Sequence, residues 1–470
     1  MLKKSPFKGG TFKGGIFYII SMKTALIIGA GPAGLTAAFE FLKKGDVHPI
    51  VVEQEDFVGG ISRTVEHNGN RMDIGGHRFF SKNNWVMEWW KTIYSDMMIR
   101  PRLSRILYMR KFFDYPVSLN ANTIKGLGLW RMAKIGTSYL RYSLFQIKKE
   151  KNLQDFMLNR FGKELYLTFF KDYTEKVWGI PCEQISAEWG AQRIKGLSIA
   201  KTIKHALFKN SKETSLIDEF LYPKLGPGDL WQRAADKVLE MGGEIKFNTK
   251  IEKLNLKEYD YVLSSMPIKD LINALENVPP NIKEIANGLV YRDFITVGVL
   301  LEKLEVGNIK DNWIYVQEND VKVGRLQIFN NWSEHLVKDK SKVWLGMEYF
   351  ANEGDDLWNM SERVFSVFAI AELEKIGMAK KENVLDTVVV KVPKAYPAYF
   401  GTYNKFGELK AWLDGIDNLF LIGRNGMHKY NNMDHSMLSA KEAVNAIRSG
   451  SKDKSAIWKV NSEEDYHEGK

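Results

Sequence analysis

The chain has 470 residues, of which 44% are hydrophobic and 26% charged, the usual balance for a globular protein with more than one domain. Its formal net charge of +10 is spread along the chain and is not gathered in basic arms, which argues against a nucleic-acid-binding protein. The single cysteine, Cys182, excludes an internal disulfide and a cysteine-based metal site. We therefore expect a cytoplasmic protein that binds no metal.

The first 21 residues differ from the rest of the chain. Residues 6–10 (PFKGG) are nearly repeated as 11–15 (TFKGG), and the apolar run 16–20 that follows is too short to span a membrane. We expect no transmembrane segment, and we expect the lead 1–21 to be disordered. Met22, directly before the first predicted strand, is an alternative start of the protein.

A glycine-rich turn between a strand and a helix opens the folded part of the sequence. The apolar run 25–28 predicts a buried parallel strand, and 35–44 predicts an alanine-rich helix. Between them, Gly29, Gly31 and Gly34 have the spacing that permits a tight turn, close approach of the backbone to a pyrophosphate, and close packing of helix on strand. The helix N-terminus would hold the phosphates with its unpaired N–H groups, and the predicted site therefore includes two further residues of this turn, Pro32 and Ala33.

An acidic residue follows the second predicted strand at the distance that a bound ribose requires. The strand 50–52 leads into Glu53, which lies 19 residues after Gly34 (53 minus 34). An acid about 20 residues beyond the glycines accepts the ribose hydroxyls of a dinucleotide. The sequence therefore predicts a dinucleotide-binding domain.

A second glycine pair indicates which dinucleotide is bound. Residues 54–64 (QEDFVGGISRT) resemble the extension found in FAD enzymes of the glutathione-reductase-like structural class. The resemblance implies FAD as the cofactor. It also implies cofactor contacts for five residues of this extension: Gln54, Gly59, Gly60, Ser62 and Arg63.

The middle of the chain predicts short strands and then a helical region. Strands are expected over 106–110 and 111–117, and helical periodicity follows over 123–151, 153–170 and 187–208. The stretch 123–151 interleaves apolar and basic residues. That pattern is typical of the solvated wall of a helical subdomain, and also of a helix lying on a membrane surface.

The α/β pattern returns after this helical region. We expect a helix over 229–241 and then buried strands over 244–254, 261–267 and 418–423, the last followed by a helix that begins near Asp434. Between them, strands over 294–301, 313–316, 325–329, 343–350 and 388–392, with a helix over 361–375, indicate a largely antiparallel sheet. The charged tail 451–470 is expected to be mobile.

These elements predict an α/β protein built around a glutathione-reductase-like FAD-binding Rossmann domain in discontinuous segments, with a helical insertion and an antiparallel-sheet substrate domain. The expected FAD-binding segments are 22–100, 215–270 and 401–450. The helical domain would span 119–214, and the mixed β-sheet substrate domain would combine 101–118 with 271–400.

The stretch 423–447 carries the most specific motif after the first glycine turn. A strand that ends in glycine, a polar loop and a helix would bring a helix N-terminus to a flavin ring, where the dipole stabilises negative charge on the reduced flavin. Gly423-Arg424, Tyr430 and 432–436 (NMDHS) resemble the C-terminal flavin motif of UDP-galactopyranose mutases, especially the eukaryotic-type branch and its bacterial relatives. The resemblance implies flavin contacts for six residues: Gly423, Arg424, Asn432, Met433, Asp434 and Ser436. His435 and Asp434 can also be read as capping groups of the helix.

Other segments extend this resemblance to the rest of the cofactor site. The sequence 73–77 (DIGGH) is similar to that family's flavin-facing loop, which implies that Gly75, Gly76 and His77 lie beside the ring. Ile251 falls on the segment that presents backbone to the adenine in this class. Outside this context His77 would be interpreted as an ordinary loop histidine.

The resemblance also implies a nucleotide-sugar pocket. Trp178, in 176–181 (KVWGIP), would line it, and Arg193 and Arg325 would bind the diphosphate as a pair of fixed planar cations. Pocket tyrosines are expected at three positions: Tyr315, Tyr396 and Tyr430. Without the resemblance, Arg193 is interpreted as a surface ion-pair partner, Trp178 as a core residue and the tyrosines as strand-end residues.

Two features depart from the family pattern. Trp332 stands where that branch usually has a further diphosphate-binding tyrosine, and the loop between Tyr430 and Asp434 is shorter. Both bear on the identity of the sugar nucleotide. Related bacterial enzymes act on dTDP-fucopyranose and similar donors, so UDP-galactopyranose and dTDP-fucopyranose types both remain open.

The chemistry implied by the resemblance needs no protein nucleophile. The family contracts a pyranose ring to a furanose without net redox, with N5 of reduced flavin as the nucleophile, in surface polysaccharide synthesis. His77, Arg193 and Arg325 would be the side chains acting in catalysis, and NAD(P)H the external reductant. No convincing Ser-His-Asp, paired-acid or metal arrangement is visible in the sequence.

Two other functions remain compatible with the sequence. One is an FAD-dependent oxidoreductase of the amine-oxidase or protoporphyrinogen-oxidase type, which shares the same scaffold. The other is a non-catalytic flavoprotein that binds a partner or a lipid surface through 123–151. The two arginines with Trp178 favour a diphosphate over an amine or a porphyrin. The sequence leaves the oligomeric state open.

Overall fold

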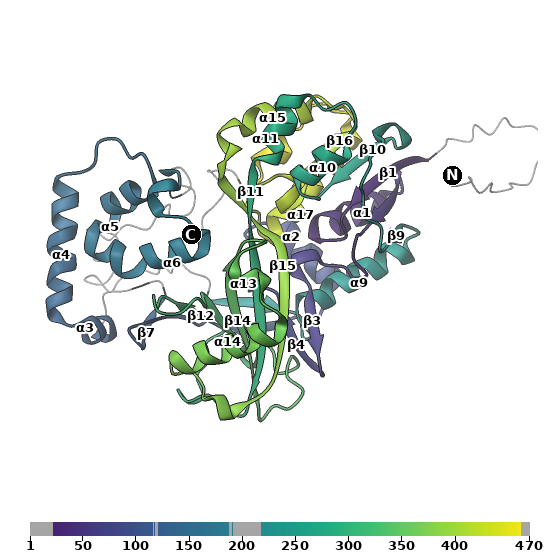
Figure 1. Cartoon of the computed structure of the whole chain (residues 1–470). Coiled ribbons are helices and arrows are strands. Elements are labelled where there is room, and N and C mark those ends of the chain that lie inside the picture. The colour runs from purple at the N-terminus through teal and green to yellow at the C-terminus, as the bar shows by residue number, and fades with distance from the viewer. Residues whose placement is uncertain (1–21, 116, 118–120, 188–189, 191–217, 462–470) are drawn as a thin grey trace, which may run out of the picture.

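The computed structural model describes residues 22–115, 117, 121–187, 190 and 218–461. A parallel sheet with its helices, a larger mixed sheet and a group of helices form three parts that meet at the centre of the molecule (Figure 1). The lead 1–21, Arg193 and most of the predicted helix 187–208 lie outside the described residues.

The parallel sheet has five strands in the order β16-β10-β1-β2-β9, and every pairing in it is parallel. Its strands come from three separated parts of the chain: β1 (Lys23–Ile28), β2 (Val47–Val52), β9 (Glu244–Lys246), β10 (Tyr261–Ser264) and β16 (Leu419–Leu421). The apolar runs arise because the central strands are buried on both faces. Its main helices are α1 (Pro32–Lys44), α9 (Pro227–Glu240) and α17 (Met433–Ser449). The predicted assembly of a Rossmann domain from discontinuous segments is confirmed.

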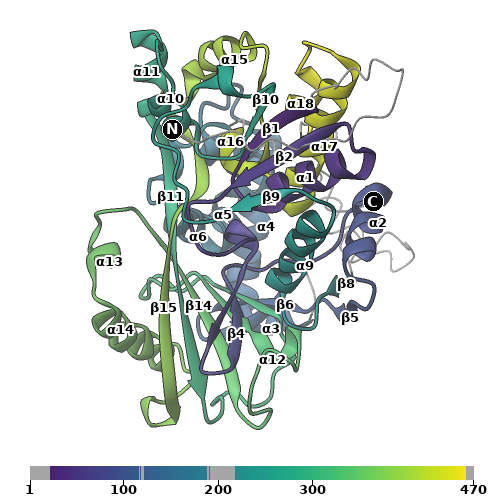
Figure 2. The ribbon, with the colours of Figure 1, turned by 90° about the vertical axis from the view of Figure 1, so that its right-hand side faces the viewer.

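The mixed sheet has seven strands in the order β15-β11-β14-β13-β12-β6-β7. They are β6 (Ser104–Tyr108), β7 (Lys111–Asp114), β11 (Leu289–Leu301), β12 (Trp313–Val316), β13 (Arg325–Ile328), β14 (Val343–Ala351) and β15 (Val384–Gly401). All neighbours are antiparallel except β6 and β12, which are parallel. The long strands β11, β14 and β15 extend away from the parallel sheet, and α14 (Glu362–Lys375) packs on their far part (Figure 2).

The helical part lies on the other side of the mixed sheet in Figure 1 and contains α3 (Ala121–Leu127), α4 (Leu129–Leu144), α5 (Leu153–Phe169) and α6 (Lys171–Trp178). The helical pattern expected over 123–151 is interrupted: Gly128, with φ of +80°, separates α3 from α4, and α4 ends at Leu144. Gly162, with φ of +72°, breaks α5 in its middle. Left-handed glycines end or bend helices in this way because the backbone hydrogen-bond ladder cannot continue through them.

Two cations, the half-buried Lys176 and the buried Arg292, join the helical part to the mixed sheet. The Nζ of Lys176 on α6 donates to the carbonyls of Val316 (3.3 Å), Glu318 (2.9 Å) and Val323 (3.0 Å). The guanidinium of Arg292 on β11 donates from Nε to a carbonyl at the C-terminal end of α6, that of Val177 (3.0 Å). Cations at a helix C-terminus are also favoured by the helix dipole.

The strand predicted over 244–254 is wrong beyond Lys246. β9 pairs only with β2, and that ladder ends where Val52 faces Lys246. The chain then turns back along the end of β2, where the N–H of Thr249 donates to the carbonyl of Glu53 (2.8 Å). A strand needs a partner to continue, and past Lys246 the described residues of this stretch form only an isolated bridge, between Leu254 and Leu275.

The prediction of a mobile tail over 451–470 is wrong for the part that the structure describes. Residues 455–459 form α18 (Ser455–Lys459), and the side chain of Ile457 is buried against the core. The Nζ of Lys429 donates to the carbonyls of Trp458 (3.1 Å) and Val460 (2.6 Å). The charged composition of the tail gave no indication that 455–460 is held by buried contacts.

Shorter elements complete the fold. They are β3 (Thr64–His67), β4 (Asn70–Asp73), α2 (Asn84–Ile93), β5 (Met98–Pro101), β8 (Glu219–Tyr222), α10 (Ile268–Ala274), α11 (Pro280–Asn287), α12 (Phe329–Trp332), α13 (Asp356–Asn359), α15 (Phe406–Asp414) and α16 (Gly423–Gly426). Within the described ranges, no helix is both long enough and apolar enough to cross a bilayer.

Candidate functional site: an extended cofactor and substrate cavity

A cavity of about 1260 Å³ lies where the three parts of the molecule meet. The ends of β1, β2 and β10, the loop after β4, α6, the mixed sheet and the start of α17 all contribute lining residues. Ligands of open α/β sheets bind beyond the carboxyl ends of the parallel strands, which is where this cavity begins.

The glycine turn after β1 forms one end of the cavity. Gly29 has φ of +100°, and a Cβ at this position would lie 2.3 Å from the Oγ of Ser265. A Cβ at Gly34 would lie 1.9 Å from the carbonyl oxygen of Gly29. No side chain fits at either position, so the backbone of the turn is left open toward the cavity and α1 packs directly on it.

Glu53 stands at the end of β2 with both carboxylate oxygens held. Oε2 accepts the N–H of Ala30 (2.8 Å), and Oε1 accepts the N–H of Glu55 (3.2 Å). Burial raises the pKa of this carboxyl, although the backbone hydrogen bonds act in the opposite direction. Glu53 therefore links the glycine turn to the end of β2, and it lines the cavity.

The loop after β4 is fixed by a buried carboxyl group. Asp73 accepts hydrogen bonds from the hydroxyls of Thr64 (3.0 Å) and Tyr222. Burial raises the pKa of Asp73 to about 7. A Cβ at Gly76 would lie 1.8 Å from the indole ring of Trp313, so the loop backbone rests directly on that ring.

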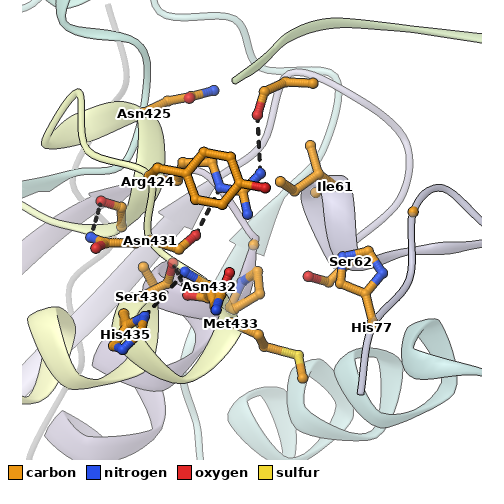
Figure 3. Close-up of a pocket in the computed structure, with 18 of the residues that line it drawn as sticks. Ile61, Ser62, His77, Arg424, Asn425, Asn431, Asn432, Met433, His435 and Ser436 are labelled. Carbon is orange, nitrogen blue, oxygen red and sulfur yellow. Dashed lines mark hydrogen bonds between the residues drawn. The ribbon is translucent and has the colours of Figure 1, made fainter. Parts of the chain in front are cut away.

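His77 follows in this loop and lines the cavity. Burial lowers its pKa to about 4, and the positive charge of Arg424 acts in the same direction. The imidazole is therefore neutral at physiological pH. In Figure 3, His77 and Ser62 lie on one side of the site, and Arg424, Asn432 and Met433 lie on the other.

Arg424 is held rigidly on α16. Its Nε donates to the carbonyl of Asn431 (2.8 Å), and its Nη1 donates to that of Ala395 (3.1 Å). The guanidinium lies 4.7 Å from the ring centroid of Tyr430, which is stacked on Tyr396 at 5.5 Å. A fixed positive charge therefore lies beside two stacked phenol rings in the cavity wall.

The N-terminus of α17 reaches the same space. Asn432 caps the helix, and its N–H donates to the Nδ1 of His435 (3.3 Å). Asp434 accepts a hydrogen bond from the hydroxyl of Ser81 (2.9 Å), and the Oγ of Ser436 donates to the carbonyl of Asn432 (3.0 Å). The first turn of a long helix thus faces the cavity with its positive dipole end.

An arginine from the mixed sheet lies at the far end of the cavity. The Nε of Arg325 is 2.6 Å from Oε2 of Glu348, and its Nη2 donates to the hydroxyl of Tyr396 (2.8 Å). Its guanidinium carbon lies 4.9 Å and 4.7 Å from the ring centroids of Trp313 and Phe350. Burial raises the pKa of Glu348, against the charge of Arg325. The arginine is therefore pre-oriented by a buried carboxylate and by three aromatic rings.

Aromatic side chains surround this arginine. Tyr315 packs edge-on against Tyr173 of α6 at 5.7 Å and face-tilted against Tyr115 at 4.5 Å. Trp332 is buried and donates from its indole N–H to the carbonyl of Asn312 (2.8 Å). Trp178 is also buried, in the core of the helical part, but still reaches the cavity.

The structure brings most of the predicted site residues to this one cavity. Those that line it are Gly29, Gly31, Pro32, Ala33, Glu53, Gln54, Gly60, Ser62, Gly75, Gly76, His77, Trp178, Ile251, Tyr315, Arg325, Trp332, Tyr396, Gly423, Arg424, Tyr430, Asn432, Met433, Asp434 and Ser436. Three expected cofactor residues do not line it: Gly34, Gly59 and Arg63. Arg63 instead lies over the ring of Phe57 at 3.8 Å. Arg193 lies outside the described residues.

Several lining residues were not predicted from the sequence. Tyr173, Trp313 and Asn431 line the cavity, as does Asn461, close to the end of the described chain. The amide of Asn461 donates to the carbonyl of Tyr430 (3.0 Å) and to Oδ1 of Asn431 (3.0 Å). Asn431 lies inside the motif stretch 423–447, but no motif marks Tyr173, Trp313 or Asn461, which reach the site through tertiary contacts between distant segments.

Among the described parts of the chain, no group of three or more His, Cys, Asp or Glu side chains could hold a metal ion.

Comparisons with known proteins agree with this geometry. Residues 27–93 match the model of an NAD(P)-binding Rossmann-like domain. The chain is 26% identical over 176 residues to the “Probable UDP-galactopyranose mutase” of Klebsiella pneumoniae, a match that covers 35% of this chain and 43% of that protein. The similarity in sequence thus spans less than half of that relative.

The similarity in structure is more extensive. A crystal structure of reduced UDP-galactopyranose mutase superposes with a TM-score of 0.81 at 20% identity, covering 94% of this chain and 99% of the other. The “Putative protoporphyrinogen oxidase” of Exiguobacterium sp. 255-15 superposes with a TM-score of 0.70 at 16% identity, covering 92% and 99%. At these identities the matches show the fold, which is the fold that the motifs predicted.

The glycine turn, the motif at the start of α17, the partial sequence match and the fold over nearly the whole chain lead to one conclusion. The chain has the fold of UDP-galactopyranose mutase and of the protoporphyrinogen-oxidase-like protein, and part of its sequence is similar to that of a UDP-galactopyranose mutase.

Proposed function

We propose that this protein is an FAD-dependent nucleotide-sugar mutase, which interconverts pyranose and furanose forms of a sugar such as UDP-galactose or dTDP-fucose. The observation that carries the proposal is the continuity of the cavity. It runs from the glycine turn and Glu53 to an aromatic chamber around Arg325. Such a reaction requires one cavity that holds the cofactor at one end and the substrate at the other.

The residues present fit FAD. The backbone at Gly29 and Gly31 carries no side chains and therefore leaves room for a pyrophosphate. Ser265 leaves no space for a side chain at Gly29. Glu53 would accept ribose hydroxyls, and the N-terminus of α17 would face the flavin. When bound and reduced, the flavin supplies the nucleophile that the protein itself lacks.

The chain's own side chains would bind and orient the sugar nucleotide. Arg325 offers a fixed planar cation to a diphosphate, and Tyr396 and Tyr430 offer hydroxyls beside it. His77, neutral because of burial, would donate or accept a hydrogen bond without adding a charge beside the cofactor. Tyr173, Val177 and Trp178 of α6 would cover the chamber and exclude water.

Arg193, the second arginine of the expected diphosphate clamp, belongs to this proposal through the resemblance of its motif. NAD(P)H as the reductant, surface polysaccharide synthesis as the pathway and the cytoplasm as the location are likewise proposed from the resemblance alone.

An FAD-dependent oxidoreductase is the second candidate. The same fold occurs in the protoporphyrinogen-oxidase-like neighbour, and the aromatic walls would also accept an apolar substrate. Arg325 argues against an amine substrate, which carries no anion for this cation, whereas a nucleotide sugar would offer it a diphosphate and a porphyrinogen its propionate carboxylates.

The deciding experiment is anaerobic. The purified flavoprotein is reduced with dithionite and given UDP-galactose, UDP-N-acetylgalactosamine or dTDP-fucose, and the sugar nucleotides are separated by chromatography. A furanose product that forms only with reduced flavin supports the mutase and identifies its donor. Oxygen uptake with an amine or porphyrinogen, and no furanose from any donor, would replace the mutase by the oxidoreductase.

A further inference from the structure

Helix α4 exposes a stripe of large apolar side chains on the face opposite to its packed side. Of its 16 residues only Ile135 is buried. Leu129, Leu140 and Leu144 are 79%, 60% and 76% exposed, and Trp130 is 75% exposed. With 3.6 residues per turn, these four residues lie on one face and Ile135 on the other.

The apolar stripe continues beyond both ends of the helix. Phe145, directly after α4, is 76% exposed, and Ile124 on α3 is 39% exposed. A monomeric protein rarely leaves such a row of leucine and aromatic side chains in water unless the row contacts something. In Figure 1, α4 forms the outer edge of the helical part, with α5 on its inner side.

The charge around this stripe has a single sign. Between Tyr115 and Lys149 the sequence has no Asp or Glu, but it has six cations: Lys125, Arg131, Lys134, Arg141, Lys148 and Lys149. All but Arg131 are exposed. No salt bridge joins any of the six to a carboxylate within the ranges that the structure describes.

This combination distinguishes among possible occupants of the surface. A second copy of the chain would bring the same cations face to face, which costs free energy at short range. An anionic bilayer supplies both an apolar layer for the leucines and negative headgroups for the lysines and arginines. Trp130, with the Nζ of Lys134 5.3 Å from its ring centroid, is the type of residue found at membrane interfaces.

We propose that α4 and its flanking residues dock the protein on an anionic lipid surface. The helix would lie in the plane of the interface with Leu129, Leu140 and Leu144 inserted among the lipids. α5 and α6 separate α4 from the mixed sheet, so docking leaves the cavity free. The proposal does not depend on which reaction the cavity performs.

The test uses the full-length flavoprotein and sedimentation with sucrose-loaded vesicles. Vesicles of phosphatidylcholine alone are compared with vesicles that contain about 30 mol% phosphatidylglycerol, enough to give a substantial negative surface potential. We expect binding to the anionic vesicles only. It should weaken several-fold when the salt concentration is raised from about 0.1 M to about 1 M, because the Debye length shortens from about 10 Å to about 3 Å.

Two double variants separate the apolar and the electrostatic contributions. Leu140→Ser with Leu144→Ser removes the stripe, and Lys134→Glu with Arg141→Glu reverses two charges at its rim. Each should lower the partition coefficient on anionic vesicles by about tenfold or more. Flavin absorbance and the unfolding midpoint, compared with those of the parent protein, show whether the variants are folded.

Matched controls come from α14 and the turn that follows it. Val364 and Val367 are 54% and 62% exposed on a surface without such a basic surround, and Lys380 and Lys381 are exposed cations. Val364→Ser with Val367→Ser, and Lys380→Glu with Lys381→Glu, should leave vesicle binding within about twofold.

Three results would overturn the proposal. One is equal binding to neutral and anionic vesicles, or no binding to either. Another is an equal loss in the α14 controls. The third is a self-associated protein in analytical ultracentrifugation that the Leu140→Ser/Leu144→Ser variant dissociates while vesicle binding stays absent. That last result would assign the stripe to a second copy of the chain.

Discussion

The backbone of Gly29 restricts position 34 to glycine. A Cβ at position 34 would lie 1.9 Å from the carbonyl oxygen of Gly29, and that carbonyl belongs to the turn itself. Neither backbone can move without displacing α1 from the parallel sheet. Substitution at this position should therefore act on both stability and the cofactor.

We predict that Gly34→Ala lowers the free energy of unfolding by about 2 kcal/mol or more and reduces the flavin content of the purified protein. Gly407→Ala is the matched control, because Gly407 is also helical and a Cβ there meets nothing within 4 Å. The control should stabilise the protein by about 0.5–1 kcal/mol. Urea unfolding and the ratio of flavin to protein absorbance measure both effects. Equal behaviour of the two variants would contradict the steric argument.

Arg325 and Glu348 form an ion pair whose carboxylate is fully buried. Glu348 also accepts a hydrogen bond from the amide of Gln327 (2.7 Å). Removing only the cation leaves a buried negative charge with little compensation, which costs more than the pair contributes. The arginine should therefore matter for folding as well as for the substrate.

We predict that Arg325→Met lowers the free energy of unfolding by about 3–5 kcal/mol, and that adding Glu348→Gln recovers most of this loss. Neither variant should bind a sugar nucleotide, because the cation is absent from both. Chemical denaturation measures the first effect and isothermal titration with UDP-galactose the second. Full binding by the double variant would remove Arg325 from the substrate site.

Among the helices and strands, α18 lies in a charged segment whose composition is typical of an exposed tail, yet its Ile457 is buried in the core. The polar loop before α17 holds α18 through Lys429, whose Nζ donates to two carbonyls at the end of α18. Lys459, Val460 and Asn461 then line the cavity. Lysine usually lies on the surface, yet the half-buried Lys429 anchors this segment.

We predict that Lys429→Met releases α18 and weakens cofactor retention. Two charge-assisted hydrogen bonds are lost, so local opening of 455–461 should become easier by about 2 kcal/mol. Amide hydrogen exchange of this segment measures the change. Lys452→Met is the control, because Lys452 lies close by in sequence and forms an exposed ion pair with Asp417. Unchanged exchange in Lys429→Met would show that the apolar contacts of Ile457 hold the helix alone.

The helices and strands themselves follow the sequence pattern closely where they are buried. The strand predicted over 313–316 is β12 (Trp313–Val316), and the helix predicted over 361–375 is α14 (Glu362–Lys375). Periodicity failed at ends that depend on a neighbour. β9 stops where its partner strand stops, and the pattern over 123–151 is divided by Gly128. Local residues determine the type of an element, but its partners determine its length.

For the molecule as a whole, α6 closes one wall of the cavity because it is held against the mixed sheet. The ammonium group of Lys176 satisfies three carbonyls near the ends of β12 and β13. Burial lowers the pKa of Lys176 to about 8, so it still carries its proton at neutral pH. Through this contact α6 brings Tyr173 and Trp178 to the cavity.

We predict that Lys176→Met lowers the free energy of unfolding by about 2–4 kcal/mol, because three carbonyls lose a charged donor. It should also raise KM for the sugar nucleotide more than it lowers kcat, since α6 covers the chamber without touching the cofactor cradle. Lys171→Met is the control on the same helix. Lys171 forms a partly exposed pair with Glu175 at 3.7 Å, and its loss should cost about 0.5 kcal/mol. A loss in kcat alone would contradict a covering role.

Features that depend on short spacing along the chain could be predicted from the residues alone. The glycines at 29, 31 and 34, the acid at 53 and the motif at 432–436 identify a dinucleotide fold, because each works through the backbone of its own turn or helix. Which side chains share the cavity depends on tertiary packing. The pairing of Arg325 with Glu348, the arrival of Asn461 and the exposure of α4 depend on contacts between segments far apart in the chain. Such contacts leave no periodic or spaced pattern, since they are set by how the sheets and helices pack.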